Sequence, residues 1–245
     1  MTCNAGASLG TVARDVWGEW KQFLAYLALC TLIIAVTVVL IPTSIPDFQR
    51  FFGTPHPLMV VVTAALLGGG ALRLLQARDW AEITKGSVTV RGIRLSAGLA
   101  TVFAVVIVIA DVVLRYPEGI NVPLPQAALF YPVVGFVAEI VFHVLPFTLL
   151  MLILSPLRGR LTDGKRIGIS IALTALAEPT FQISFAGGPL TWIDAYTWIH
   201  VFSISLLQLY VFRRYDFVSM YAFRLIYYAY WHVLWGAIRL PLFFH

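Results

Sequence analysis

The amino-acid sequence predicts an all-α fold, a polytopic integral membrane bundle of about seven transmembrane helices. Three observations support this prediction. Of the 245 residues, 60% are hydrophobic and only 12% are charged, about half the charged share of a soluble domain. Mean hydropathy is +0.85. The apolar residues also fall into runs of roughly 17–23 residues, the length that crosses a bilayer as a helix.

Seven apolar runs are expected to span the membrane. They cover about residues 23–40, 58–75, 95–114, 132–154, 167–185, 196–212 and 217–238. Pro42 and Pro46 are expected to end the first span, because proline interrupts helical hydrogen bonding. Residues 1–20 are typical of a short interfacial helix that leads into the membrane. The alternating Ser-Val-Thr-Val-Arg at 87–91 suggests a short strand.

The distribution of basic residues predicts the orientation. Five lysines or arginines lie at the second connection between spans and four at the fourth, against one each at the first and third. Because such residues are retained in cytoplasmic loops, we expect a multi-pass cell-membrane protein with its N-terminus in the cytoplasm and its C-terminus outside. The net charge of +5 is attributed to these loops, so nucleic acid is not an expected partner. The chain divides into an interfacial segment at 1–20, three helices within 21–130 and four within 131–245.

Four ionisable residues lie deep within predicted spans, namely Glu139, His143, Glu178 and His232. A charge at the bilayer centre costs about 2.5–3.5 kcal/mol on insertion scales, so such residues usually face a partner or a wet cavity. Glu139 and His143 are four residues apart and therefore share one helix face. From the helical rise, Glu139, Glu178 and His232 lie at similar depths. We expect their side chains to point into one interior cavity, with His143 close by.

Other polar residues of the spans are expected to have ordinary interfacial roles. Asp111 and His200 lie near span ends, and Arg224 is expected to extend its side chain to the membrane surface. Glu178 precedes Pro179, which predicts a kink beside the acid.

Carboxylates and imidazoles that converge in a low-dielectric cavity can hold a divalent metal or activate a water molecule. The candidate metal ligands are Glu139, Glu178 and His232, and the metal would be zinc or another divalent ion. The alternative is structural. In it, Glu139 and His143 join neighbouring helices, and Glu178 is satisfied by an arginine or a tyrosine.

Three short segments resemble the motifs of the CPBP family of intramembrane endopeptidases, which includes the CAAX prenyl proteases and bacteriocin-processing enzymes. Ala138-Glu139-Ile-Val-Phe142-His143-Val144 resembles the first motif, two glutamates followed by three residues and an arginine. Thr174-Ala-Leu-Ala-Glu178 resembles the second, an aromatic residue followed by three residues and a histidine. His232-Val-Leu-Trp-Gly236 resembles the third, a histidine followed by three residues and an asparagine. The resemblance covers about residues 132–239, which makes 131–245 a CPBP-like core.

The motifs depart from the family at four positions. These are Ala138 for the glutamate thought to activate water, His143 for arginine, Glu178 for histidine and Gly236 for asparagine. Only Glu139 and His232 keep the family's residue type. Because Gly236 lacks a side chain, we expect it to leave a space beside His232 that the family fills with an amide.

The resemblance implies an intramembrane endopeptidase that hydrolyses membrane-proximal or prenylated peptides, with Glu139, His143, Glu178 and His232 as catalytic residues. The alternative is a catalytically inactive, CPBP-like membrane scaffold that binds a peptide or a partner helix. A third class is a transporter or proton relay, because intramembrane glutamate and histidine also serve that purpose. The expected partners are membrane lipids and a hydrophobic or prenylated peptide or a partner helix.

Overall fold

The computed structural model describes residues 6–186 and 190–244, and in this part of the chain every regular element is a helix. The all-α prediction is therefore confirmed. Six helical stretches of the described residues are long and apolar enough to cross a membrane, and they give the protein a multi-pass architecture. They are Trp20–Phe52, Pro57–Gln76, Ser87–Leu114, Ala127–Ile153, Asp163–Ser184 and Trp192–Arg214.

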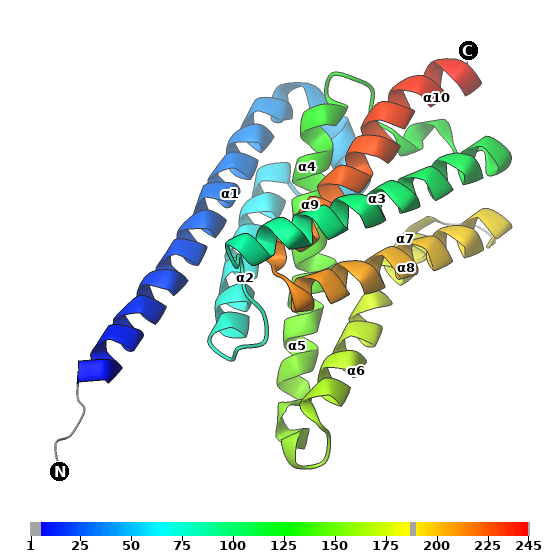
Figure 1. Ribbon diagram of the computed structural model, residues 1–245. Helices are drawn as coiled ribbons and strands as arrows, with labels where there is room; N and C mark the ends of the chain where they lie inside the picture. Colours follow the sequence, from blue (N-terminus) through cyan, green and yellow to red (C-terminus); the bar gives the residue numbers. More distant parts are fainter. Residues whose placement is uncertain (1–5, 187–189, 245) are drawn as a thin grey trace, which may run out of the picture.

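The seventh predicted span is helical as well. It consists of α9 (Phe217–Tyr228), the π-helical segment η4 (Ala229–Trp235) and α10 (Gly236–Phe243). Its tyrosines and arginines make it less apolar than the other six. Figure 1 places the first turn of α1 (Gly6–Phe52) and the last turn of α10 at opposite ends of the bundle, as an odd number of crossings requires. Which end faces the cytoplasm stays a prediction.

The first helix is longer than the sequence predicts. α1 continues through Pro42 and Pro46 to Phe52 and has one kink, at Ser44, where φ is −126° and ψ is 15°. The prediction that the two prolines end the span is wrong. Spanning helices tolerate proline because neighbouring helices and local backbone adjustments satisfy the freed carbonyl groups. The same helix also includes most of the segment at 1–20.

The predicted strand at 87–91 is the first turn and a half of α3 (Ser87–Leu114). α3 packs on α9, and Gly92 allows the two helices to approach closely. A Cβ atom at this position would lie 2.2 Å from Ser219 Oγ and 2.9 Å from Tyr215 Cβ. The residues that alternate in sequence are therefore held as a helix by tertiary contact, which overrides local preference.

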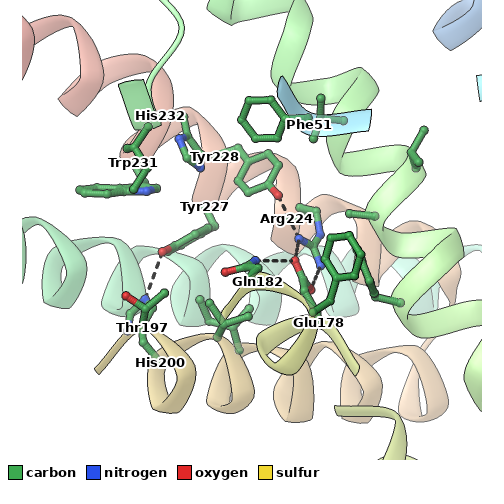
Figure 2. A pocket seen from close by; sticks show the side chains of 18 of the residues that line it. Phe51, Glu178, Gln182, Thr197, His200, Arg224, Tyr227, Tyr228, Trp231 and His232 are labelled. Carbon is green, nitrogen blue, oxygen red and sulfur yellow. Dashed lines mark hydrogen bonds and ion pairs between the residues drawn. The ribbon is translucent and has the colours of Figure 1, made fainter. Parts of the chain in front are cut away.

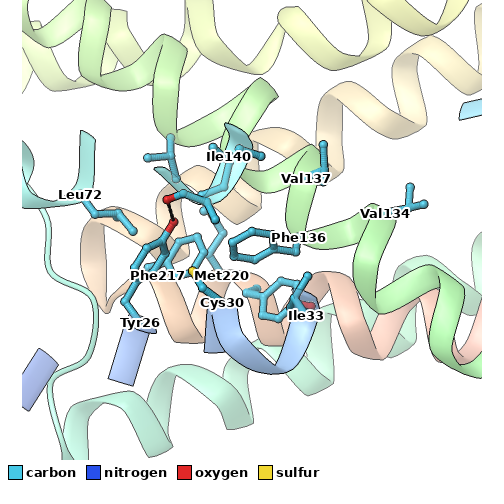
Figure 3. Packing of buried hydrophobic residues seen from close by; sticks show 14 of the residues in the cluster. Tyr26, Cys30, Ile33, Leu72, Val134, Phe136, Val137, Ile140, Phe217 and Met220 are labelled. Carbon is cyan, nitrogen blue, oxygen red and sulfur yellow. Dashed lines mark hydrogen bonds between the residues drawn. The ribbon is translucent and has the colours of Figure 1, made fainter. Parts of the chain in front are cut away.

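The centre of the bundle is the fourth span, made of α4 (Ala127–Ala138), the π-helical segment η2 (Glu139–Val144) and α5 (Leu145–Ile153). All residues from 133 to 140 are buried. α1 and α2 (Pro57–Gln76) cover one side of this span, as Figure 3 shows around Tyr26 and Phe136. The Tyr26 hydroxyl donates to the carbonyl of Ala65 at 2.7 Å and ties α1 to α2.

α6 (Asp163–Ala175), α7 (Ala177–Ala186) and α8 (Trp192–Arg214) complete the bundle beside α5 and α9. Both π-helical segments contain predicted site residues. η2 contains Glu139 and His143, and η4 contains His232. Wide turns of this kind occur often at functional sites, because they reorient side chains within an otherwise regular helix.

Candidate functional site

Glu139 lies in the middle of the bundle and is completely buried. Its Oε1 accepts hydrogen bonds from Arg224 Nε at 2.6 Å and from the Gln208 side-chain amide. Its Oε2 accepts one from His143 Nδ1 at 2.8 Å. The predicted pairing of Glu139 and His143 on one helix face is therefore present, and both carboxylate oxygens are satisfied inside the protein.

Glu178 comes from α7 and meets the same arginine. Arg224 Nη1 donates to Glu178 Oε1 at 2.8 Å and Nη2 donates to Oε2 at 2.7 Å, a bidentate arrangement. His143 Nε2 lies 3.8 Å from Glu178 Oε2 and has no hydrogen-bond partner. We call Glu139, His143, Glu178 and Arg224 the charge cluster. Three of the four predicted site residues belong to it.

Arg224 is the member of the charge cluster that was not predicted as a site residue. Its side chain is almost completely buried, and the expectation that it extends to the membrane surface is wrong. Gly135 makes room for it, since a Cβ there would lie 3.2 Å from Arg224 Cδ. A buried guanidinium needs ionic partners, and Glu139 and Glu178 supply two. The signal in the sequence was two carboxylates inside spans, which require a cation at similar depth.

His232 lies apart from the charge cluster. Its ring stacks on Tyr131, with centroids 4.2 Å apart and 15° between the planes. The Asn121 amide lies 3.4 Å from His232 Nδ1 and also donates to the His232 carbonyl at 3.3 Å. Because Nδ1 accepts from this amide, the ring proton is on Nε2.

Gly236 does not leave the space that was expected beside His232. A Cβ at this position would lie 2.9 Å from Asn121 Nδ2, so the asparagine side chain already occupies the volume. The amide that contacts the histidine therefore comes from the connection between α3 and α4, not from one turn further along the same helix. Gly236 is small because Asn121 packs against it.

Asp111 is completely buried, so its predicted interfacial role is wrong. Arg239 Nε donates to Asp111 Oδ2 at 2.7 Å, and the Trp235 indole donates to the same oxygen at 2.7 Å. Arg239 Nη1 donates further to Asn121 Oδ1 at 2.9 Å. A continuous set of hydrogen bonds thus links Asp111 to His232 and fixes the orientation of the imidazole.

A cavity of about 570 Å³ lies between the charge cluster and His232 (Figure 2). Most of its lining is aromatic or branched aliphatic, including Phe51, Phe142, Phe181, Ile204, Phe223 and Trp231. Glu178, Arg224 and His232 line it, whereas Glu139 and His143 lie behind the wall. The predicted convergence on one cavity is thus present for Glu178 and His232, and Glu139 is separated from the cavity by Arg224 and Gln208, which both donate to it and line the cavity. Ala138 also lines it.

A second set of polar side chains lines the cavity around His200. His200 is buried, whereas the sequence predicted it at the membrane interface. Its Nε2 is 3.1 Å from the Tyr227 hydroxyl. Nearby, the Tyr116 hydroxyl is 2.9 Å from Thr197 Oγ1. Burial raises the pKa of Tyr116 to about 12, so its hydroxyl is neutral at physiological pH.

The predicted metal ligands are not arranged as a ligand set. Glu139 and Glu178 are joined by a guanidinium, a cation that takes the place a metal ion would need. Among the residues that the structure describes, no group of three or more histidines, cysteines, aspartates or glutamates is placed to hold a metal ion.

The fold and the cavity together define a polytopic, all-α membrane protein with an internal pocket of the size that holds a small ligand. Comparison of the chain with protein-family models, curated proteins and solved structures gives no match. The CPBP resemblance therefore depends on the three motifs alone.

Proposed function

We propose that this protein binds the apolar group of a membrane-embedded peptide, such as a prenyl chain or a large hydrophobic side chain, and does not hydrolyse it. One observation supports this most directly. Arg224 donates to three of the four oxygens of Glu139 and Glu178. The fourth oxygen, Glu139 Oε2, accepts from His143.

A general base must reach the proton that it removes, directly or through one water molecule. Glu139 does not line the cavity, and Glu178 lines it with both oxygens engaged by the guanidinium. Ala138 lines the cavity where the family has its water-activating glutamate. The carboxylates thus serve to bury Arg224, and this arrangement favours the scaffold over the enzyme.

The size and lining of the cavity support the choice of ligand. A volume of about 570 Å³ falls within the roughly 300–1,000 Å³ of typical small-ligand pockets and is too small for a partner helix, which is about 10 Å across. Aromatic and branched aliphatic walls favour an apolar group. His232 supplies a donor, its Nε2–H, for one polar end of the ligand.

Binding can be tested with a photoreactive farnesylated peptide and the same peptide without the prenyl group. The protein in detergent should be labelled by the prenylated probe. Ala138→Phe should abolish labelling, because it fills the cavity. Leu149→Phe is a matched control, since Leu149 is exposed on α5. Equal labelling of both variants would contradict the proposal, and labelling that does not depend on the prenyl group would exclude a prenyl chain as the group that is bound.

The intramembrane endopeptidase is the second candidate, and one observation favours it: Glu178 and His232 line the same cavity. Glu178 would act as the base once Arg224 moved away. Purified protein should therefore be assayed for peptide cleavage and bound metal, alongside Glu178→Gln and His232→Ala. Cleavage that both variants lose would establish the enzyme. An inactive parent with an active Ala138→Glu variant would establish the scaffold, because that substitution directs a carboxylate into the cavity.

A further inference from the structure

Hydroxyl side chains in these helices mostly bond to their own backbone. Thr37, Thr148 and Ser203 each donate to the carbonyl four residues earlier, at 2.7–2.8 Å. This satisfies a hydroxyl inside a membrane without outside help. Ser170, Thr174 and Ser205 are exceptions. Their hydroxyls are buried and have no hydrogen-bond partner.

Two of the exceptions, Ser170 and Thr174, lie on one face of α6. Arg166, Ser170, Thr174 and Glu178 follow each other at intervals of four residues, so they share one face of α6 and the start of α7. All four are buried. From Arg166 to Glu178 the row is about 18 Å long, from the helical rise. It begins near the turn between α5 and α6, at one end of the bundle in Figure 1, and ends in the charge cluster.

Ser205 is the third exception and comes from a neighbouring helix. It lies on α8, which packs on α6, and precedes by three residues Gln208, a donor to Glu139. Arg166 has two further guanidinium nitrogens without partners, while its Nη2 pairs with Asp163. We call the three hydroxyl residues Ser170, Thr174 and Ser205, together with Arg166 at the outer end, the hydroxyl row. Buried polar atoms that lack protein partners are the usual positions of ordered water.

The charge cluster contains more carboxylates than guanidinium groups. It holds two carboxylates, Glu139 and Glu178, against one guanidinium, and α8 contributes only the neutral Gln208. The Tyr228 hydroxyl, from α9, faces Arg224 at 3.0 Å. A net negative charge this deep in a membrane is costly. His143 lies between the carboxylates, 2.8 Å from one and 3.8 Å from the other, so a proton that reaches the charge cluster meets this imidazole.

We propose that the hydroxyl row holds a file of water molecules that conducts protons between the α5–α6 end of the bundle and the charge cluster. A proton entering at that end passes along the file, one O–H bond forming and one breaking at each step, and reaches the imidazole of His143. Asp163 offsets the positive charge of Arg166, which would otherwise oppose entry.

The cavity continues the path on the other side. Glu178 follows Thr174 of the hydroxyl row by four residues and also lines the cavity, whose lining includes Arg50 and Gly119. Arg50 belongs to the last turn of α1, which Figure 1 places at the end of the bundle opposite the α5–α6 turn. A proton released from the cluster to water in the cavity would complete a passage across the membrane. Because the path uses the same cavity as the proposed ligand, the flux is expected in the protein without ligand.

Proton flux into sealed vesicles tests the proposal. The full chain would be reconstituted in phospholipid vesicles with a pH gradient and a potassium ionophore, and the internal pH followed with a trapped dye. The parent protein should dissipate the gradient faster than empty vesicles. Thr174→Val, which removes the hydroxyl at nearly constant volume, should lower the rate to that of empty vesicles, and so should Glu178→Gln.

Two controls separate the row from general damage. Thr148→Val removes a buried hydroxyl that bonds to its own helix and should leave the flux unchanged. Thr174→Ser keeps the hydroxyl and should retain flux, which excludes misfolding at this site as the cause. A parent protein no faster than empty vesicles would overturn the proposal. So would equal flux in Thr174→Val and Thr148→Val.

Discussion

Replacing Arg224 by leucine should destabilise the protein more than any surface substitution. The side chain donates to three carboxylate oxygens and to the Tyr228 hydroxyl, and it is almost completely buried. Removing one partner of a buried ion pair costs about 3–5 kcal/mol, because the remaining charge is left uncompensated. At about 2–4 °C per kcal/mol for a chain of this size, the unfolding midpoint should fall by roughly 6–20 °C.

The assay is thermal unfolding of detergent-solubilised protein, followed by loss of helical circular dichroism. A triple variant, Arg224→Leu with Glu139→Gln and Glu178→Gln, should recover most of the loss, because it leaves no unpaired charge. Arg160→Leu is the control, since Arg160 is exposed in the connection between α5 and α6. A single variant within about 1 kcal/mol of the parent would refute the reasoning, as would a triple variant no more stable than the single one.

Three further predictions concern packing, the second ion pair and topology. Gly92→Ala should cost about 1–3 kcal/mol of unfolding free energy, because the added methyl group overpacks α3 against α9. Gly98→Ala on the same helix is the control and should not destabilise the protein, because Gly98 has open space around it. Equal denaturation midpoints for the two variants would contradict this. Arg239→Met should destabilise by about 3–5 kcal/mol, measured in the same thermal assay, and an unchanged midpoint would show that Asp111 needs no partner. Reporter fusions after Lys165 and at the C-terminus should report opposite sides of the membrane, and the same side for both would remove the predicted topology.

The fold could be predicted because hydropathy is a local property of the sequence. Each apolar run of sufficient length has few alternatives to a helix in lipid, so the all-α class and the approximate spans were accessible from composition. The errors at Pro42, Pro46 and residues 87–91 have one cause. Local rules for proline and alternation were applied where neighbouring helices decide the conformation.

The charge cluster was predictable only in part, because its contacts differ in sequence separation. Glu139 and His143 are four residues apart, so helical spacing was enough to pair them. Arg224 is 85 residues from Glu139 and 46 from Glu178, and no local pattern connects them. Asn121 and His232 are 111 residues apart, so no local pattern could indicate which residue supplies the amide beside His232.

The π-helical segment η2 gives the fourth span one residue more than a regular α-helix of the same length would hold. The wide turn takes up this residue locally, so the side chains of α5 keep the directions in which they pack. Phe147 and Met151 face the interior and are almost completely inaccessible. Deleting one residue within 139–144 should therefore remove the wide turn and leave Phe147 and Met151 in place, whereas deleting one residue at the start of α5 would turn everything beyond it by about 100°. A related sequence that is one residue shorter within 139–144 could keep this fold and lose only the local arrangement of Glu139 and His143.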